Sequence, residues 1–277
     1  MKFGVAIFPT DYAISMTELA PAAEEVGFES LWVAEHSHIP TSRESRWPGG
    51  DQLPTQYWHT IDPFIALTMA ATASKTLLVG TGICLVIERD PIHTAKEVAS
   101  VDHVSNGRFI FGVGGGWNRE EMADHGTDFS RRWKLLRERV EAMKAIWTQD
   151  EAEYHGELVD FGPMLSWPKP VQRPHPPIIL GGSGPKILER VVRYADGWMP
   201  NRGDVLERIP ELREMEQAAG RGHIPVSYYP KPNAEEIERV AKAGVERCIY
   251  YVPADGRDAA LRKLDELAPM IRPYRSG

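Results

Sequence analysis

Apolar runs alternate with amphipathic stretches along most of this chain. Residues 76–117 show the pattern most clearly: an apolar run, a helix that opens at Asp90-Pro91, and a second apolar run that ends in glycines. Asp90 is a favourable N-cap, Pro91 suits the first helical position, and Asn106-Gly107 ends the helix. Strands that are apolar throughout are typical of a parallel sheet covered by helices on both faces. This segment therefore predicts one βαβ unit.

The same alternation continues from end to end and predicts eight strands and eight helices. Such alternation favours a closed (β/α)8 TIM barrel formed by residues 1–277 as a single domain, with an open doubly wound sheet as the alternative. Strands are expected in the two apolar runs just described and over residues 2–8, 29–34, 177–180, 196–200, 224–229 and 247–252, with further helices over 17–26, 205–219 and 234–243 and after residues 62, 133, 185 and 257.

Two segments interrupt the alternation. Residues 39–60 are rich in Pro, Gly and aromatic residues and lack periodicity, so they are a candidate lid or binding loop. Residues 148–177 contain a predicted hairpin around His155-Gly156 and a Pro-rich return, which we interpret as an insertion. Loops at the carboxyl ends of the strands build the active sites of such barrels, and we place the insertions at that face.

Composition and charge narrow the class of partner. The chain has 277 residues, of which 42% are hydrophobic, and a formal net charge of -7. This charge argues against general affinity for nucleic acid or acidic membranes, whose phosphates select Lys- and Arg-rich surfaces. No apolar run approaches the roughly 18 residues of a membrane span, and the cysteines form no metal or disulfide motif. We expect a cytoplasmic protein that binds a small molecule; a homodimer is left open.

Two glycine-rich strand ends are candidate ligand sites, because ligands of parallel α/β folds bind at the carboxyl ends of the strands. Gly181-Gly182-Ser183-Gly184 precedes a helix and could bind a phosphate through backbone N–H groups, with a tight turn as the alternative. The segment from Gly112 to Trp117 lacks the spacing of a dinucleotide fingerprint. We interpret it as a flat surface beside a ring system with Trp117 as a wall; close packing of strand and helix is the alternative.

Glu35 and His36 follow the second predicted strand and are the candidate catalytic residues. An imidazole titrates near neutrality, and a neighbouring carboxylate can orient it, so His36 suits proton transfer. His36 and His38 also match the His-x-His of some barrel metal sites, but the later strand ends supply no further ligands, and we predict no metal. A structural, hydrogen-bonded histidine is the remaining alternative.

The chain resembles the luciferase-like flavin and deazaflavin oxidoreductases, especially the branch that depends on coenzyme F420. The resemblance rests on residues 29–40, 77–121, 169–174 and 176–200, which contain the strand ends described above and occur in order along the chain. The family is a (β/α)8 barrel with an insertion, and its cofactor ring lies over the carboxyl ends of the strands. The resemblance implies the same arrangement here.

The resemblance also implies a role for each candidate residue. Gly82-Ile83 falls where the family commonly has a non-prolyl cis peptide bond behind the cofactor ring. Glu35 and His36 take the place of an acidic-His pair whose histidine is the acid or base, although aspartate is the more usual acid. The implied cofactor-binding residues are Gly82, Ile83, Gly114, Gly115, Gly116, Trp117, Gly181, Gly182, Ser183 and Gly184. Trp47, Tyr57, Trp58, Trp167 and Trp198 indicate an aromatic-rich cavity, in which Trp58 and Trp198 are assigned to the substrate pocket. The cofactor's acidic tail could meet Arg89, Arg119, Arg131 and Arg202.

The implied function is an oxidoreductase that transfers a hydride between coenzyme F420 and a small organic substrate, with His36 as proton donor or acceptor. FMN shares the ring shape and a phosphate with the deazaflavin, so an FMN-dependent luciferase-like monooxygenase is the first alternative. A flavin- or deazaflavin-binding protein without catalysis is the second. The sequence does not identify the substrate.

Overall fold

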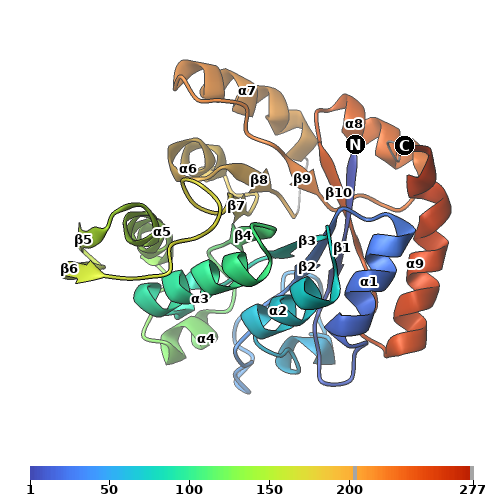
Figure 1. Cartoon of the computed structure of the whole chain (residues 1–277), viewed down its shortest axis with the longest axis horizontal. Helices are drawn as coiled ribbons and strands as arrows, with labels where there is room; N and C mark the ends of the chain where they lie inside the picture. Colours follow the sequence, from blue (N-terminus) through green and yellow to red (C-terminus); the bar gives the residue numbers. More distant parts are fainter. Residues whose placement is uncertain (202–204, 275–277) are drawn as a thin grey trace.

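The computed structural model describes residues 1–201 and 205–274. Its central feature is a sheet of eight parallel strands in the order β8-β7-β4-β3-β2-β1-β10-β9. A parallel bridge between Trp198 and Val226 joins the two ends of this order, so the sheet closes into a barrel (Figure 1). The predicted (β/α)8 TIM barrel is confirmed. The barrel strands are β1 (Lys2–Ile7), β2 (Ser30–Val33), β3 (Leu78–Thr81), β4 (Phe109–Val113), β7 (Ile178–Gly181), β8 (Gly197–Met199), β9 (Ser227–Tyr228) and β10 (Arg247–Tyr251).

Helices surround the barrel on its outside (Figure 1). They are α1 (Met16–Val26), α2 (Pro63–Ala73), α3 (Pro91–Val104), α4 (Arg119–Asp124), α5 (Arg132–Thr148), α6 (Ile187–Tyr194), α7 (Ile209–Ala218), α8 (Ala234–Lys242) and α9 (Arg257–Ile271). The carboxylates of Asp62 and Asp90 cap α2 and α3 by accepting hydrogen bonds from backbone N–H groups of the first turn, as their Asp-Pro sequences predicted. Within the described residues, no helix combines the length and apolarity needed to cross a membrane.

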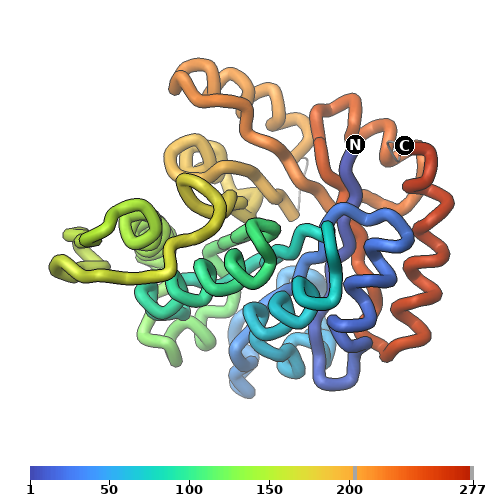
Figure 2. Tube along the Cα trace, viewed as in Figure 1, coloured from blue at the N-terminus to red at the C-terminus, as the bar shows by residue number. Residues whose placement is uncertain are grey.

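The predicted hairpin forms the antiparallel strands β5 (Glu151–His155) and β6 (Asp160–Leu165). It follows α5, lies on the outside of the molecule against that helix (Figure 2), and its tip returns to the start of α5, where Glu157 pairs with Arg131 and Lys134. A helix that follows a parallel strand runs back toward the amino-terminal end of the barrel. The hairpin therefore departs from the amino-terminal end of the barrel, and its tip returns toward the carboxyl-terminal face at the start of α5.

One predicted strand is much shorter than expected because of a proline. The strand expected over residues 224–229 is reduced to the two residues of β9. Pro225 has no N–H to donate, and the N–H of Val226 donates to Oε2 of Glu246 at 2.5 Å instead of to a neighbouring strand. The pairing of β9 with β10 therefore begins only at Ser227.

A small apolar cluster fills the interior of the barrel and is separate from the larger core between strands and helices. Trp32 on β2 is fully buried in it and donates a hydrogen bond from Nε1 to Oγ of Ser30 at 2.9 Å. Glycines on neighbouring strands leave room for its indole. A Cβ at Gly4 would lie 2.9 Å from Nε1, and one at Gly80 would lie 2.7 Å from Cζ3. Interior packing around Trp32 therefore requires glycine at these two positions.

Replacing Gly80 with alanine should lower the free energy of unfolding by about 1 to 3 kcal/mol, since the buried indole of Trp32 has no free space into which it could shift. Chemical denaturation measures the change. The matched control is Gly162→Ala, because a Cβ there meets no atom within 4 Å. Equal stability of the two variants would show that Trp32 does not require the glycine.

Candidate active site

A cavity of about 330 Å³ opens at the carboxyl ends of the barrel strands. Every barrel strand contributes to its wall with a residue at its end or shortly after it: Phe8, His36, Ile83, Gly114, Gly181, Met199, Tyr229 and Tyr251. Trp47, Pro48 and Tyr57 complete the wall. They come from the long segment after β2, residues 39–60, which we call the binding loop. Its contribution to the cavity agrees with the sequence prediction.

Gly82 and Ile83 separate the cavity from the barrel interior. Both line the cavity, and a Cβ at Gly82 would lie 3.3 Å from Cβ of Trp32. The peptide bond between them is cis, as the family resemblance implied. The side chain of Ile83 fits against the next strand ends, where a Cβ at Gly114 or Gly181 would lie 2.4 or 2.9 Å from its atoms. These glycines therefore serve close packing, and they also leave bare backbone facing the cavity.

His36 lines the cavity and is held by a carboxylate that the sequence pattern did not reveal. Its Nδ1 lies 2.7 Å from Oε2 of Glu121, and the two side chains are 7% and 0% exposed. Oε1 of Glu121 accepts a hydrogen bond from the backbone N–H of Ser37 at 3.0 Å. Because a carboxylate accepts from Nδ1–H, Nε2 is the ring nitrogen that can exchange a proton with a ligand.

Glu35 has different partners from the one we predicted. Its Oε2 accepts a hydrogen bond from the backbone N–H of Leu85 at 2.5 Å, and its Oε1 accepts one from Nε of Arg89 at 2.6 Å. Glu35 therefore joins the segment after β2 to the segment after β3 and leaves the orientation of His36 to Glu121. The neighbour of His36 in sequence is therefore not its partner in space.

The short helix α4, which the sequence did not predict, carries two adjacent carboxylates with different partners. Asn118 caps the helix, and its side chain accepts from the N–H of Glu121 at 3.3 Å. Glu121 binds His36, whereas Oε1 of Glu120 accepts from the N–H of Ser45 in the binding loop at 2.6 Å. The Ser45 hydroxyl donates to the other oxygen of Glu120. Helix α4 thus holds both His36 and the binding loop.

Glu88 is a buried carboxyl group close to these charges. Among the described residues, neither of its oxygens has a hydrogen-bond partner. Burial, reinforced by the negative charges of Glu121 and Glu35, raises the pKa of Glu88 to about 9. Glu88 is therefore neutral at pH 7, which avoids a third negative charge in this region.

The loop after β7 retains the features of an anion site. Gly182 has a φ of 127°, which favours glycine, whereas Gly184 has no positive φ and open space around its Cα. Of the four predicted residues, Gly181 and Gly182 line the cavity, and Ser183 and Gly184 follow beyond it. Arg208 donates to the backbone carbonyls of Gly184 and Pro185 at 3.1 Å. This cation beside the loop was not anticipated.

The two tryptophans assigned to the substrate pocket lie outside it. Trp198 is fully buried in the core and donates from Nε1 to a backbone carbonyl at 2.9 Å, because the next residue, Met199, is the one that faces the cavity. Trp58 is 44% exposed and does not line the cavity. Trp47 and Tyr57, which were also expected in an aromatic cavity, do line it, whereas Trp167 is exposed and does not.

The arginines expected to meet an acidic tail are mostly engaged elsewhere. Arg89 pairs with Glu35 and two further carboxylates, and Arg131 pairs with Glu157. The guanidinium of Arg119 lies 4.3 Å from the centre of the Phe129 ring. Arg202 lies outside the described residues.

His38 does not join His36 in a metal site. Its Nε2 lies 2.9 Å from Oδ2 of Asp124, and its Nδ1 lies 2.9 Å from the hydroxyl of Ser37. In the described part of the chain, no group of three or more His, Cys, Asp or Glu side chains is arranged as metal ligands.

Two tyrosines of the cavity could have been predicted from the sequence, because they lie at the ends of predicted strands. Tyr229 comes directly after β9 and Tyr251 ends β10, and their rings stack with centroids 5.2 Å apart. Their positions at strand ends would have identified both residues. Glu121 had no such signal, because its helix is short and follows a loop.

Comparison with known proteins agrees with this geometry. Residues 1–271 match the family model of the luciferase-like monooxygenases. An uncharacterised protein of Mycobacterium tuberculosis is 40% identical over 98% of this chain and 99% of its own length. Two solved structures share the fold. An F420-dependent secondary alcohol dehydrogenase, in complex with an F420-acetone adduct, has a TM-score of 0.81 at 19% identity and 99% coverage of both chains. A monooxygenase from Streptomyces bottropensis has a TM-score of 0.80 at 21% identity and 100% coverage of both chains. The chain therefore belongs to the luciferase-like monooxygenase family.

Proposed function

We propose that this protein is an F420-dependent oxidoreductase that transfers a hydride between the deazaflavin and a small organic substrate. The observation that carries the proposal is the buried His36–Glu121 pair on the wall of a cavity at the carboxyl ends of the barrel strands. The F420-dependent alcohol dehydrogenase that shares the fold over nearly its whole length supports the choice of cofactor.

The residues of the cavity fit a flat ring that carries a phosphate. The volume of about 330 Å³ lies in the range of roughly 300–1,000 Å³ typical of small-molecule sites. Gly114, Gly115 and Gly116 present backbone without side chains on one wall, and Trp117 adjoins them. Gly182 and the loop before α6, with Arg208 beside it, suit a phosphate. When bound, a reduced deazaflavin supplies the hydride.

The chain's own residues handle the proton that accompanies hydride transfer. His36 holds or accepts it at Nε2, and Glu121 fixes the ring through Nδ1 and stabilises the charged imidazolium. The rings of Tyr57 and Trp117 lie 5.1 and 5.8 Å from the His36 ring and limit the access of water to it. This arrangement supports a general acid or base in a largely apolar pocket.

An FMN-dependent monooxygenase is the competing function. The family name and the monooxygenase from Streptomyces bottropensis favour it, and FMN offers the same ring and phosphate to the residues named above. Cofactor preference and oxygen consumption separate the two functions.

We expect the purified protein to bind the deazaflavin at least about tenfold more tightly than FMN, a difference of roughly 1.4 kcal/mol. The reason is that the deazaflavin has an acidic tail, which FMN lacks, and that Lys186 and Arg190 follow the loop after β7. Fluorescence titration with each cofactor measures both affinities. Equal or tighter binding of FMN, together with oxygen consumption supported by reduced FMN, would assign the protein to the monooxygenases.

Replacing His36 with asparagine should lower turnover by roughly 10²- to 10⁴-fold on any substrate that the wild type converts, because the proton-transfer group is lost. The dissociation constant of the cofactor should change only a few-fold. His38→Asn is the matched control and should keep the wild-type rate, since His38 binds Asp124 outside the cavity. A normal rate per bound cofactor in His36→Asn would assign His36 a structural role. No turnover by the wild type over a broad substrate panel would favour a cofactor-binding protein.

The neutral state of Glu88 makes stability depend on pH. Its pKa is about 9 in the folded protein and near 4.5 in the unfolded chain, so the folded state retains a proton that the unfolded state has released. The contribution of Glu88 to the free energy of unfolding is fully present below pH 4.5. It is lost as pH rises toward 9, by at most about 1.4 kcal/mol per pH unit. Glu88→Gln should remove this loss in denaturation experiments at pH 5, 7 and 9. The control Glu214→Gln, at an exposed position, should lose stability with rising pH as the wild type does. If the stability of the wild type and that of Glu88→Gln depend on pH in the same way, Glu88 is ionised in the folded protein.

A further inference from the structure

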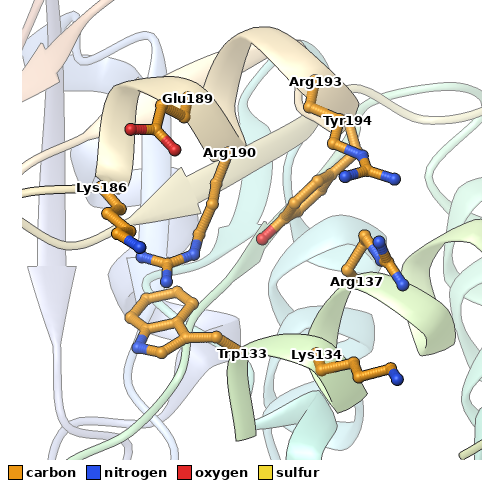
Figure 3. A pocket seen from close by; sticks show the side chains of 8 residues that line it. All are labelled: Trp133, Lys134, Arg137, Lys186, Glu189, Arg190, Arg193 and Tyr194. Atoms are coloured by element: carbon orange, nitrogen blue, oxygen red, sulfur yellow. The ribbon is translucent and has the colours of Figure 1, made fainter. Parts of the chain in front are cut away.

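A second cavity, of about 450 Å³, lies between the start of α5 and the length of α6. We call it the cationic cavity, because its wall contains the basic side chains Lys134, Arg137, Lys186, Arg190 and Arg193 (Figure 3). The remaining side chains of the wall are Trp133, Glu189 and Tyr194. A single acidic residue of the wall is too little to neutralise this concentration of positive charge.

The positive charge is only partly compensated by residues outside the wall. Lys134 pairs with Glu157 of the hairpin, and Arg137 lies near two glutamates of its own helix. In residues 1–201 and 205–274, no carboxylate lies within 4.0 Å of the charged atoms of Lys186, Arg190 or Arg193. The guanidinium of Arg190 instead lies 4.3 Å from the centre of the Trp133 indole. Among the described residues, these three cations thus form no ion pair, and Glu189 is the one carboxylate on the same wall.

Tyr194 is an independent sign of a missing ligand. The residue is only 4% exposed, and its hydroxyl has no hydrogen-bond partner among the described residues. Figure 3 shows this hydroxyl pointing into the space beside Arg190 and Trp133. Burial raises the pKa of Tyr194, so the group is a neutral donor. A buried donor without an acceptor is costly, and an anionic oxygen in the cavity would satisfy it.

The cationic cavity adjoins the candidate active site. Trp133 lines both cavities, and a Cβ at Gly115 would lie 3.0 Å from its indole. Lys186 occupies the N-cap position of α6, two residues after Gly184 of the predicted phosphate loop. A ligand could therefore extend from one cavity past Trp133 into the other.

We propose that the cationic cavity is a binding site for an oligoanion, a short chain of carboxylates or phosphates, held by Lys186, Arg190 and Arg193 and by the Tyr194 hydroxyl. Guanidinium and ammonium groups are the standard partners of carboxylate and phosphate oxygens, and a chain of anions matches several cations along one wall. The oligoanion is either a free molecule or the acidic tail of the cofactor. Only the second source rests on the proposed function.

Isothermal titration calorimetry with inorganic tripolyphosphate tests the site without any cofactor. We expect the double variant Arg190→Gln/Arg193→Gln to bind tripolyphosphate at least roughly tenfold more weakly than the wild type. Tyr194→Phe, which removes only the hydroxyl, should weaken binding by about three- to tenfold. Arg262→Gln, an exposed arginine on α9, controls for net charge and should stay within about twofold of the wild type.

Titration with the deazaflavin distinguishes the two sources. If the cavity holds the cofactor's tail, tripolyphosphate competes with the complete, tail-bearing deazaflavin. The double variant then binds the complete deazaflavin more weakly than the wild type does. Both proteins bind a deazaflavin truncated at the phosphate equally well. If the oligoanion is a free molecule, tripolyphosphate and the complete cofactor bind together. Equal tripolyphosphate binding by the wild type and the folded double variant, checked by circular dichroism, would overturn the proposal. Failure to bind deazaflavin would overturn the proposed function and leave the tripolyphosphate result standing.

Discussion

The narrow interior of the barrel must be filled, and Trp32 fills it. Its indole occupies the space of side chains on the two neighbouring strands, so Gly4 and Gly80 have none. Trp32 also packs against Gly82 on the side of the barrel interior. Gly82 and Ile83 separate this packed interior from the cavity. The position of Ile83 then determines that Gly114 and Gly181 bear no side chain. The bare backbone that faces the cavity is thus a consequence of how the barrel is packed beneath it.

The candidate site divides into two parts that come from different regions of the chain. The proton-handling part consists of His36 and Glu121, which follow β2 and β4. The anion-binding part consists of the loop after β7, Arg208 and the cationic cavity. Its residues follow β7 and β8 in the chain, except for those of the cationic cavity that belong to α5. Trp133 connects the two parts because it lines both cavities. Under the proposed function, binding of the cofactor and transfer of the proton would therefore depend on largely separate sets of residues.

Local signals in the sequence were sufficient for the barrel and for the location of the site. Asp-Pro pairs marked the starts of α2 and α3, and the glycine-rich strand ends marked the cavity. The partner of His36 could not be found in this way, because the hydrogen bond to Glu121 spans 85 positions and depends on how two loops meet. The cationic cavity was equally hidden, since its basic side chains are spaced along α5 and α6 as on any solvated helix. Chemistry made by contacts between distant loops has no periodic signature.

Helix α4 uses neighbouring carboxylates for two purposes, with Glu120 holding Ser45 of the binding loop and Glu121 holding His36. Because both carboxylates lie on one short helix, the binding loop and the imidazole of His36 are held by the same element. Under the proposed function, a displacement of α4 that released the binding loop would also move the carboxylate away from the imidazole. The orientation of His36 would then depend on the position of a loop that is distant from it in sequence.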